Sequence, residues 1–344
     1  MIIRVAPVVA VVLVVATGAL RAQPARTMIA ALAPGPKGSD AREALALGPH
    51  GEAYEPDGKG TWVRRHAGAL SGEVVRATRA DALVIAGVEA GPPFGYRPGT
   101  AVRGDADAVG AWNMIVLGVH AKAIVGRGPR ATAAFGKLVF GLDTGKPIKL
   151  ADAPGVVTAL AASASGVVVE TDKGLAKLEA KGAAQKWKPI ANAPAHVLAL
   201  LDDRWALVDR GLLDLRTQKV TAWPAGFRVD TAIAVSNELV VAAGLHGNAP
   251  ELVTLKGATV TREPITAALV AAASGNGATK LGSGAAAIVS VVADKAGRVV
   301  VAMKDGELAV RDKAGTWTLT DVRTELPADR PGSPPAESKV ELGP

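Results

Sequence analysis

The residues best suited to bind a metal or to act as general bases are the five histidines, His50, His66, His120, His196 and His246. None lies in an HExxH or similar pattern, in which two ligands share one face of a helix, so surface or turn roles are expected. Asp105 and Asp107 are spaced as in a calcium loop, but the further oxygen ligands and the closing Glu are missing. No metal and no cofactor is therefore predicted.

Two further segments have simple structural interpretations. The glycine-rich run Gly275–Gly284 holds one lysine but lacks the Gly-Lys-Ser/Thr order that cradles a phosphate, which favours a loop. Asp202 and Asp203 precede Arg204, and such a pair is typical of a hairpin turn. Glycoside hydrolysis by two carboxylates stays open as an alternative, because it depends on a spatial separation that sequence spacing does not give.

The segment from residue 91 to residue 99 contains the candidate ligand-binding residues Phe94, Tyr96 and Arg97. Prolines and glycines surround them, which predicts a rigid loop, and aromatic residues with arginine are enriched at binding hot spots. The competing interpretation is that these rings pack the loop onto its own structural unit.

Composition excludes several classes of protein. The chain has 344 residues, a formal charge of +7 and no cysteine, which excludes disulfide scaffolds, thiolate metal sites, cysteine nucleophiles and acylated lipoprotein anchors. Basic residues are scattered singly rather than in blocks, so no nucleic-acid partner is expected.

Both ends of the chain differ from its middle. Residues 1–22 combine Arg4 with an apolar stretch from Val5 to Leu20, which predicts a cleaved signal peptide, no span after cleavage, and a periplasmic or secreted protein. Residues 23–39 are expected to be a linker, and the proline-rich residues 326–344 a disordered tail.

Residues 40–325 show the elements that must position any site. Short runs rich in Val, Leu and Ala alternate with Gly, Asp or Asn turns, as in Ala82–Val88 and Arg298–Met303. Such runs predict an all-β domain. Ile265–Ser274 is alanine-rich and has a helical alternative.

Internal repeats narrow the choice of all-β architectures. Residues 51–62 and 306–317 are identical at six of twelve positions without a gap, and both end in Asp-x-x-Gly-Thr-Trp. Trp187 and Trp223 lie 36 residues apart, a spacing typical of one four-stranded propeller blade. These landmarks divide the chain into seven units, with six as the alternative if the first only completes the last: 40–66, 70–112, 113–150, 153–190, 193–225, 228–265 and 284–323.

Several of these repeats resemble known propeller families. Leu213–Val220 followed by Trp223 resembles the end of a quinoprotein-type repeat, and Val291–Ala302 resembles repeats of sensor propellers. The resemblance implies a β-propeller of the broad quinoprotein-like or WD-like superfamily, with Asp and Gly shaping the turns and Trp filling the gaps between blades.

The expected function is that of an exported, non-enzymatic and monomeric binding scaffold. Its loops on one face would engage a protein or an envelope component. Two alternatives remain: a propeller hydrolase or lyase acting on a sugar or lactone, and an outer-membrane assembly propeller.

Overall fold

The structure is a computed structural model. It describes residues 28–35, 40–68, 70, 72–80, 83–89, 93–98, 112–114, 123–127, 130–142, 148–163, 166–181, 184–194, 197–265, 288–303 and 306–323. None of the helices in this described part is long and apolar enough to cross a membrane.

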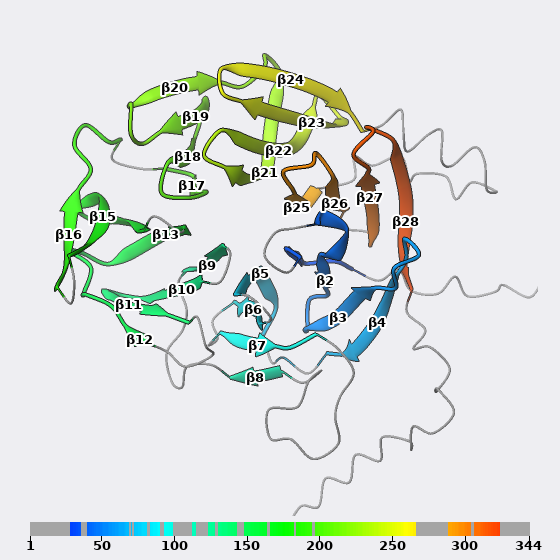
Figure 1. Ribbon diagram of the computed structural model, residues 1–344, viewed down its shortest axis with the longest axis horizontal. Helices are drawn as coiled ribbons and strands as arrows, with labels where there is room; N and C mark the ends of the chain where they lie inside the picture. The colour runs from blue at the N-terminus through cyan, green and yellow to red at the C-terminus, as the bar shows by residue number, and fades with distance from the viewer. Residues whose placement is uncertain are drawn as a thin grey trace, which may run out of the picture.

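Seven antiparallel sheets of four strands each are arranged in a ring (Figure 1). Each blade consists of four strands that follow one another in sequence, from the innermost at the centre of the ring to the outermost at the rim. Blades 1 to 4 are β1–β4 (Ala31–Ala33, Leu45–Leu47, Glu52–Pro56, Trp62–Ala67), β5–β8 (Val74–Ala80, Leu83–Val88, Phe94–Tyr96, Trp112–Met114), β9–β12 (Ala123–Arg127, Arg130–Phe135, Leu138–Gly141, Ile148–Lys149) and β13–β16 (Val157–Ser163, Gly166–Thr171, Gly174–Lys181, Ala184–Pro189). Blades 5 to 7 are β17–β20 (Ala199–Leu200, Trp205–Val208, Gly211–Asp214, Lys219–Ala222), β21–β24 (Phe227–Ser236, Leu239–His246, Ala249–Lys256, Thr259–Pro264) and β25–β28 (Ile288–Ala293, Val299–Met303, Glu307–Arg311, Trp317–Arg323).

The predicted β-propeller with seven blades is confirmed, and the alternative of six is wrong because strands β1–β4 form a complete first blade. One boundary needs correction. Strand β1 lies inside residues 23–39, which the sequence assigned to a linker, and it pairs with β2 through Leu32 and Ala46. The strand is followed by Pro34, Gly35 and Pro36, which are typical of a linker, so the sequence did not indicate a strand here. In the structure, Ile29 and Leu32 of this segment are buried. Most of Ile265–Ser274 and all of residues 326–344 lie outside the described residues.

The core consists of apolar layers between neighbouring blades. Both faces of a blade are covered by other blades, so a strand such as Leu83–Val88 is buried along its whole length and reads as a continuous apolar run. Small side chains such as Ala161 and Ala206 meet larger ones such as Leu213 in the layer between blades 4 and 5.

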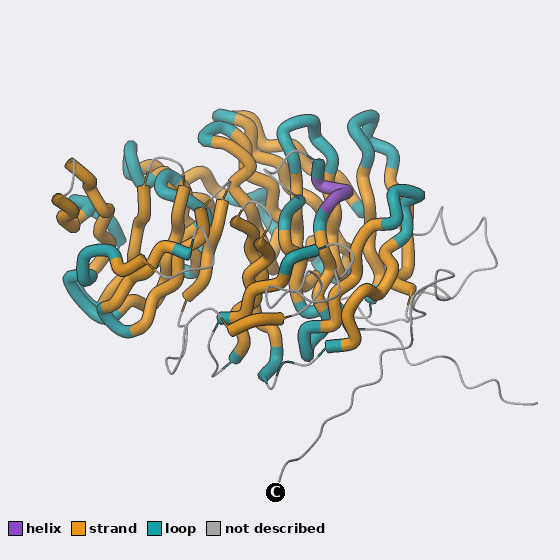
Figure 2. The backbone as a smooth tube through the Cα atoms, turned by 60° about the horizontal axis from the view of Figure 1, so that its bottom comes forward, coloured by secondary structure: helices purple, strands orange, loops and turns teal. Residues whose placement is uncertain are grey.

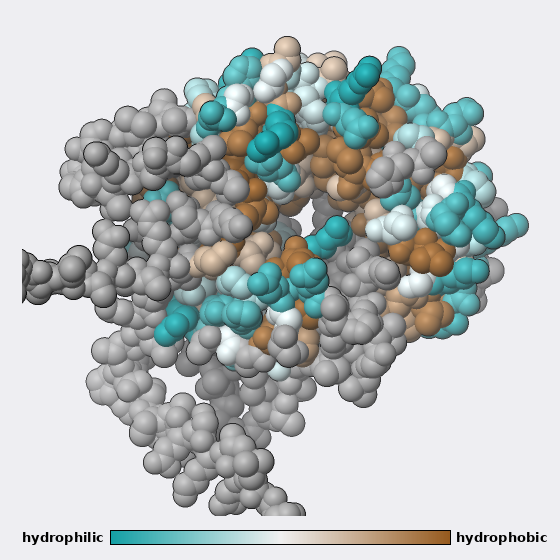
Figure 3. Space-filling view, turned by 180° about the vertical axis from the view of Figure 1, so that it is seen from behind, coloured by the Kyte–Doolittle hydropathy of each residue, from teal (hydrophilic) through white to brown (hydrophobic). Residues whose placement is uncertain are grey.

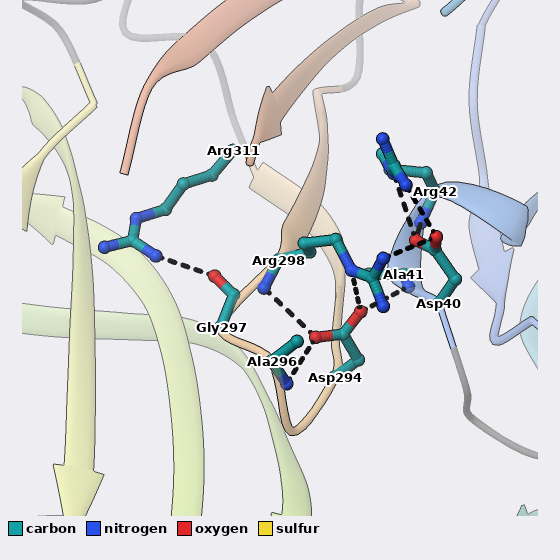
Figure 4. A network of polar contacts seen from close by, with 8 residues as sticks. All are labelled: Asp40, Ala41, Arg42, Asp294, Ala296, Gly297, Arg298 and Arg311. Carbon is teal, nitrogen blue, oxygen red and sulfur yellow. Dashed lines mark hydrogen bonds and ion pairs between the residues drawn. The ribbon is translucent and has the colours of Figure 1, made fainter. Parts of the chain in front are cut away.

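The ring closes without a strand exchanged between its two ends. Outer strands β4 and β28 pair in parallel, with Val322 opposite Trp62, which joins blades 1 and 7 into one eight-stranded sheet. Arg298 of blade 7 strengthens this junction, because its Nε donates to Asp294 at 2.6 Å and its Nη1 to Asp40 of blade 1 at 2.7 Å (Figure 4). Asp294 is almost fully buried.

The two faces of the ring carry different connections. We call the face with the turns between the first and second and between the third and fourth strands of each blade the turn face. The short 3-10 helix η2 (Ala41–Glu43) belongs to it and lies in the upper half of the molecule in Figure 2. The opposite face, here the crossover face, carries the turns between second and third strands and the connections between blades.

Candidate binding face

Aspartates fold the tight turns of the turn face. In the β3–β4 turn, Oδ1 of Asp57 accepts the backbone N–H of Lys59 at 2.7 Å and that of Thr61 at 3.1 Å. Gly60 of this turn has a φ of 89°, a conformation that favours glycine. Burial raises the pKa of Asp57, but the bonds from Lys59 and Thr61 outweigh it and leave the pKa below its usual value.

The same turn recurs in blade 7, which explains the sequence repeat. Asp312 accepts N–H groups of Ala314 and Thr316 at 2.9 and 2.8 Å, and Asp294 those of Ala296 and Arg298 at 2.8 and 3.1 Å. The expectation that Asp and Gly shape these turns is confirmed. These carboxylates are engaged inside their own turns, and none of the three is exposed.

The turns of blade 5 follow the same rule. Asp202 accepts the N–H groups of Arg204 and Trp205 at 2.8 and 2.7 Å, which confirms the predicted hairpin turn between β17 and β18. Asp203 lies beside it and accepts from Nζ of Lys177 of blade 4 at 2.8 Å. The Asp202–Asp203 pair is therefore a structural feature of the boundary between blades 4 and 5.

A pocket of about 280 Å³ opens at this boundary. Its apolar lining comes from Ile190 and Leu215. Its polar lining comes from Lys177, Asp203, Arg204, Arg216 and Asn237, so turns of blades 5 and 6 converge on a groove beside blade 4.

Hydrogen bonds hold the walls of the pocket in place. Arg204 donates from Nε and Nη2 to Oδ2 of Asp214 at 3.1 and 2.9 Å and from Nη1 to the carbonyl oxygen of Asn237 at 2.6 Å. Its guanidinium also lies 4.6 Å from the ring centre of Trp205. Burial raises the pKa of Asp214, but the bonds from Arg204 and from two backbone N–H groups outweigh it and lower the pKa. Arg216 is exposed, and its guanidinium has no partner among the described residues.

The structure separates the three candidate residues predicted from sequence. The rigid loop expected over residues 91–99 is wrong at its centre, because Phe94–Tyr96 is strand β7 of blade 2. Tyr96 has no exposed surface, and Phe94 is half-buried against the same cluster, so the packing interpretation holds for both rings. Arg97 follows the strand on the turn face and is exposed. Tyr96 has no surface left to contact a ligand, whereas for Arg97 and the half-buried Phe94 a ligand-binding role stays a prediction.

Tyr96 has a defined structural role. Its hydroxyl donates to Oε1 of Glu55 in blade 1 at 3.1 Å, and its ring centre lies 5.1 Å from that of Trp112. Burial, followed by the neighbouring Glu55 carboxylate, raises the pKa of Tyr96 far above its usual range. Tyr96 therefore joins blades 1 and 2.

The histidines are dispersed in the structure. His50 and His246 are exposed, whereas His66 is half-buried, and burial lowers the pKa of His66 below its usual value. Within the described part of the chain, no three His, Cys, Asp or Glu side chains come together as metal ligands would. His120, His196, Asp105, Asp107 and Gly275–Gly284 lie outside the described residues.

Sequence reasoning missed a repeated feature of the innermost strands. In β5, β13, β21 and β25 the pairing register shifts near the crossover end, which leaves Val75, Thr158, Asp230 and Val289 as the extra residues of four β-bulges. The only sign in the sequence is an apolar residue one place before each of them.

Exposed apolar side chains gather at this end of the channel. Met28, Val75, Val156 and Leu198 all lie at or just before an innermost strand at the crossover end, and 42% to 54% of their surface is exposed. Seen from behind, hydrophobic residues border the central opening (Figure 3). The mouth of the channel on the crossover face is thus more apolar than the tips of the turn face.

No family model and no curated protein matches the chain. Solved structures share this architecture. YCF48 from Cyanidioschyzon merolae has a TM-score of 0.52 at 15% identity, over 83% of this chain and 95% of that one. YCF48 bound to a D1 peptide has a TM-score of 0.53 at 15% identity, over 87% and 95%. The WD40 β-propeller domain of Doa1 has a TM-score of 0.51 at 13% identity, over 86% and 96%.

These likenesses define the fold class of the chain, which is a seven-bladed β-propeller. At this level of identity they show the fold alone.

Proposed function

We propose that this protein is an exported, non-enzymatic β-propeller that binds a protein through its turn face. The observation that carries the proposal is the groove between blades 4 and 5, where turns of two blades meet a third element around an apolar floor. An apolar centre with a charged rim is the usual composition of a protein-binding surface.

Two further points support a binding role. Six aspartates of the turn face accept backbone N–H groups in their own turns: Asp40, Asp57, Asp202, Asp214, Asp294 and Asp312. Asp203 pairs with Lys177. These contacts give the carboxylates a structural role rather than a catalytic one. A propeller of the same fold, YCF48, is known bound to a D1 peptide. Residues 1–22 supply the export signal in this proposal.

The test is site-directed photo-crosslinking in the native host. A photoreactive residue replaces Lys313 or Arg216 on the turn face, and Lys137 or Lys173 on the crossover face as the matched control. A discrete protein adduct formed from the turn-face positions alone supports the proposal. Adducts from neither face contradict a protein-binding function. N-terminal sequencing of the same material tests export, and a mature chain that begins at Met1 in the cytosol contradicts it.

A further inference from the structure

The two faces of the ring differ in their exposed charge. In blades 1 and 7, the turns of the turn face expose Arg42, Lys59, Lys295 and Lys313, and the acid exposed beside them is Glu43. Lys59, Lys295 and Lys313 make no salt bridge with another described residue. The tips of these two blades therefore carry an excess of positive charge.

Blades 5 and 6 continue the same pattern beside the pocket. Arg216 in the β19–β20 turn and the adjoining Lys219 and Lys256 are exposed, and Glu238 is the exposed acid among them. Arg97 adds one more exposed cation in blade 2. Over the described turns and their adjoining strand ends, eight exposed basic residues face two exposed acids.

The aspartates of this face do not reverse the excess at its tips. Their carboxylates accept backbone N–H groups of their own turns or bind neighbouring cations such as Lys177 and Arg204. None of these aspartates is exposed, whereas the lysines at the tips are.

The crossover face lacks this excess. By the same criterion its described connections expose Lys137, Lys149, Lys173 and Arg210. Against them stand five exposed acids: Glu73, Glu89, Asp152, Asp172 and Asp209. Among the described residues, exposed charge is therefore distributed unequally, and the turn face carries the positive excess.

We propose that the turn face binds an acidic, extended polypeptide segment of a partner protein, with one of its apolar side chains in the pocket between blades 4 and 5. This inference rests on the proposed function and adds the chemistry of the partner. Charge complementarity selects the acidic segment. The pocket of about 280 Å³, lined by Ile190, Leu215 and Arg216 among others, offers space for an apolar side chain of the segment.

A membrane surface and a nucleic acid fit the turn face less well. Membrane-surface proteins insert apolar or aromatic residues, and single-stranded nucleic acids stack on exposed aromatic rings. None of the described aromatic side chains is exposed, and the turn-face ends of the described strands expose two isolated large apolar residues, Ile148 in blade 3 and Val220 in blade 5. The other large exposed apolar residues of the described chain lie at the crossover ends of innermost strands.

The test uses the purified protein and a labelled synthetic peptide of Glu, Asp, Leu and Gly, with Gln and Asn replacing the acids in a control peptide. The variant R216Q/K219Q/K256Q removes three cations from the turn face of blades 5 and 6, of which Arg216 lines the pocket. The control variant K137Q/K173Q/R210Q removes three cations from the crossover face, so the net charge of the two variants is equal.

We expect the turn-face variant to bind the acidic peptide about tenfold more weakly, because three exposed charge contacts are lost, and the control variant to bind it within about twofold of the original protein. Binding should also weaken as salt is added. Equal effects of the two variants, or no preference for the acidic peptide, would overturn the inference.

Two parallel measurements separate the alternatives. Binding to phosphatidylglycerol vesicles or to single-stranded DNA, without binding to the peptide, would also overturn the inference. If the peptide test fails while photo-crosslinking still yields a protein adduct, a protein-binding function stands and only the acidic chemistry of the partner is wrong.

Discussion

The junction between blades 1 and 7 is where a single substitution should weaken the ring most clearly. Each blade is continuous in sequence, so the ring closes through β4–β28 pairing and through Arg298. Arg298→Gln keeps the backbone N–H that Asp294 accepts at 3.1 Å. It removes the guanidinium bonds to Asp294 and Asp40.

The size of the effect follows from these two bonds. A hydrogen bond to a charged group contributes about 1.5–3 kcal/mol. Asp294 also retains the N–H groups of Ala41 and Ala296 at 3.0 and 2.8 Å, so its carboxylate is not left without partners. Asp40 has 18% of its side chain exposed, and solvent reduces its loss. We therefore expect a loss of about 3 kcal/mol, and for a domain of this size a fall in Tm of about 5 °C.

Calorimetry of the purified protein measures this fall, and urea unfolding gives the free energy. The matched control is Arg228→Gln, which removes a guanidinium that is 72% exposed and lies 3.4 Å from Asp230. Such a surface pair contributes less than about 1 kcal/mol. If Arg298→Gln lowers Tm no more than Arg228→Gln does, the reasoning that Arg298 closes the ring is refuted.

Four further outcomes are expected. Asp57 and Asp214 have lowered pKa values in the folded protein, so the stability they contribute is present above the usual carboxyl pKa and is lost as pH falls through the folded pKa values. Unfolding temperatures measured between pH 6 and about pH 2 should show this loss. Asp214→Asn should make the unfolding temperature depend less on pH. Trp62→Ala should cost about 3–5 kcal/mol in urea unfolding, because Trp62 is 1% exposed and its Nε1 donates to the carbonyl of Ala44 at 2.8 Å; a cost under about 1 kcal/mol would contradict its role in packing. Tyr96→Phe should cost about 1.5 kcal/mol through the lost bond to the Glu55 carboxylate and should leave partner crosslinking unchanged, whereas lost crosslinking would restore Tyr96 as a binding residue. Deleting residues 327–344 should barely change Tm, and a fall of many degrees would contradict a disordered tail.

Local signals in the sequence were sufficient for the blade count and for most unit boundaries. The two Asp-x-x-Gly-Thr-Trp repeats correspond to equivalent hairpins of blades 1 and 7, because an Asp side chain and a glycine with positive φ suffice to form such a turn. Strands that are buried on both faces appear as apolar runs, and such runs are visible without knowledge of their neighbours. Strand β1 was missed since its three residues are too short for a pattern.

The candidate site was less predictable, because its residues come from different blades. Phe94 and Tyr96 are surrounded by turn-forming residues and predicted a loop, yet contacts with Glu55 and Trp112 bury Tyr96 in a strand. The sequence indicated only that Arg204 lies in a turn. Its hydrogen bond to the carbonyl oxygen of Asn237, which is 33 residues away in the chain, could not be predicted from local patterns.

The sequence by itself determined the all-β class, the repeating unit and the chemistry of the turns, because these depend on interactions within a few residues. Only the tertiary structure decided how blade 7 meets blade 1, which rings are buried, and which face exposes the basic residues. Lys59 and Lys313 are far apart in the chain, but they lie in equivalent turns of neighbouring blades, so both add positive charge to the same face. Closure of the ring places such residues on one face, and no local pattern encodes that placement.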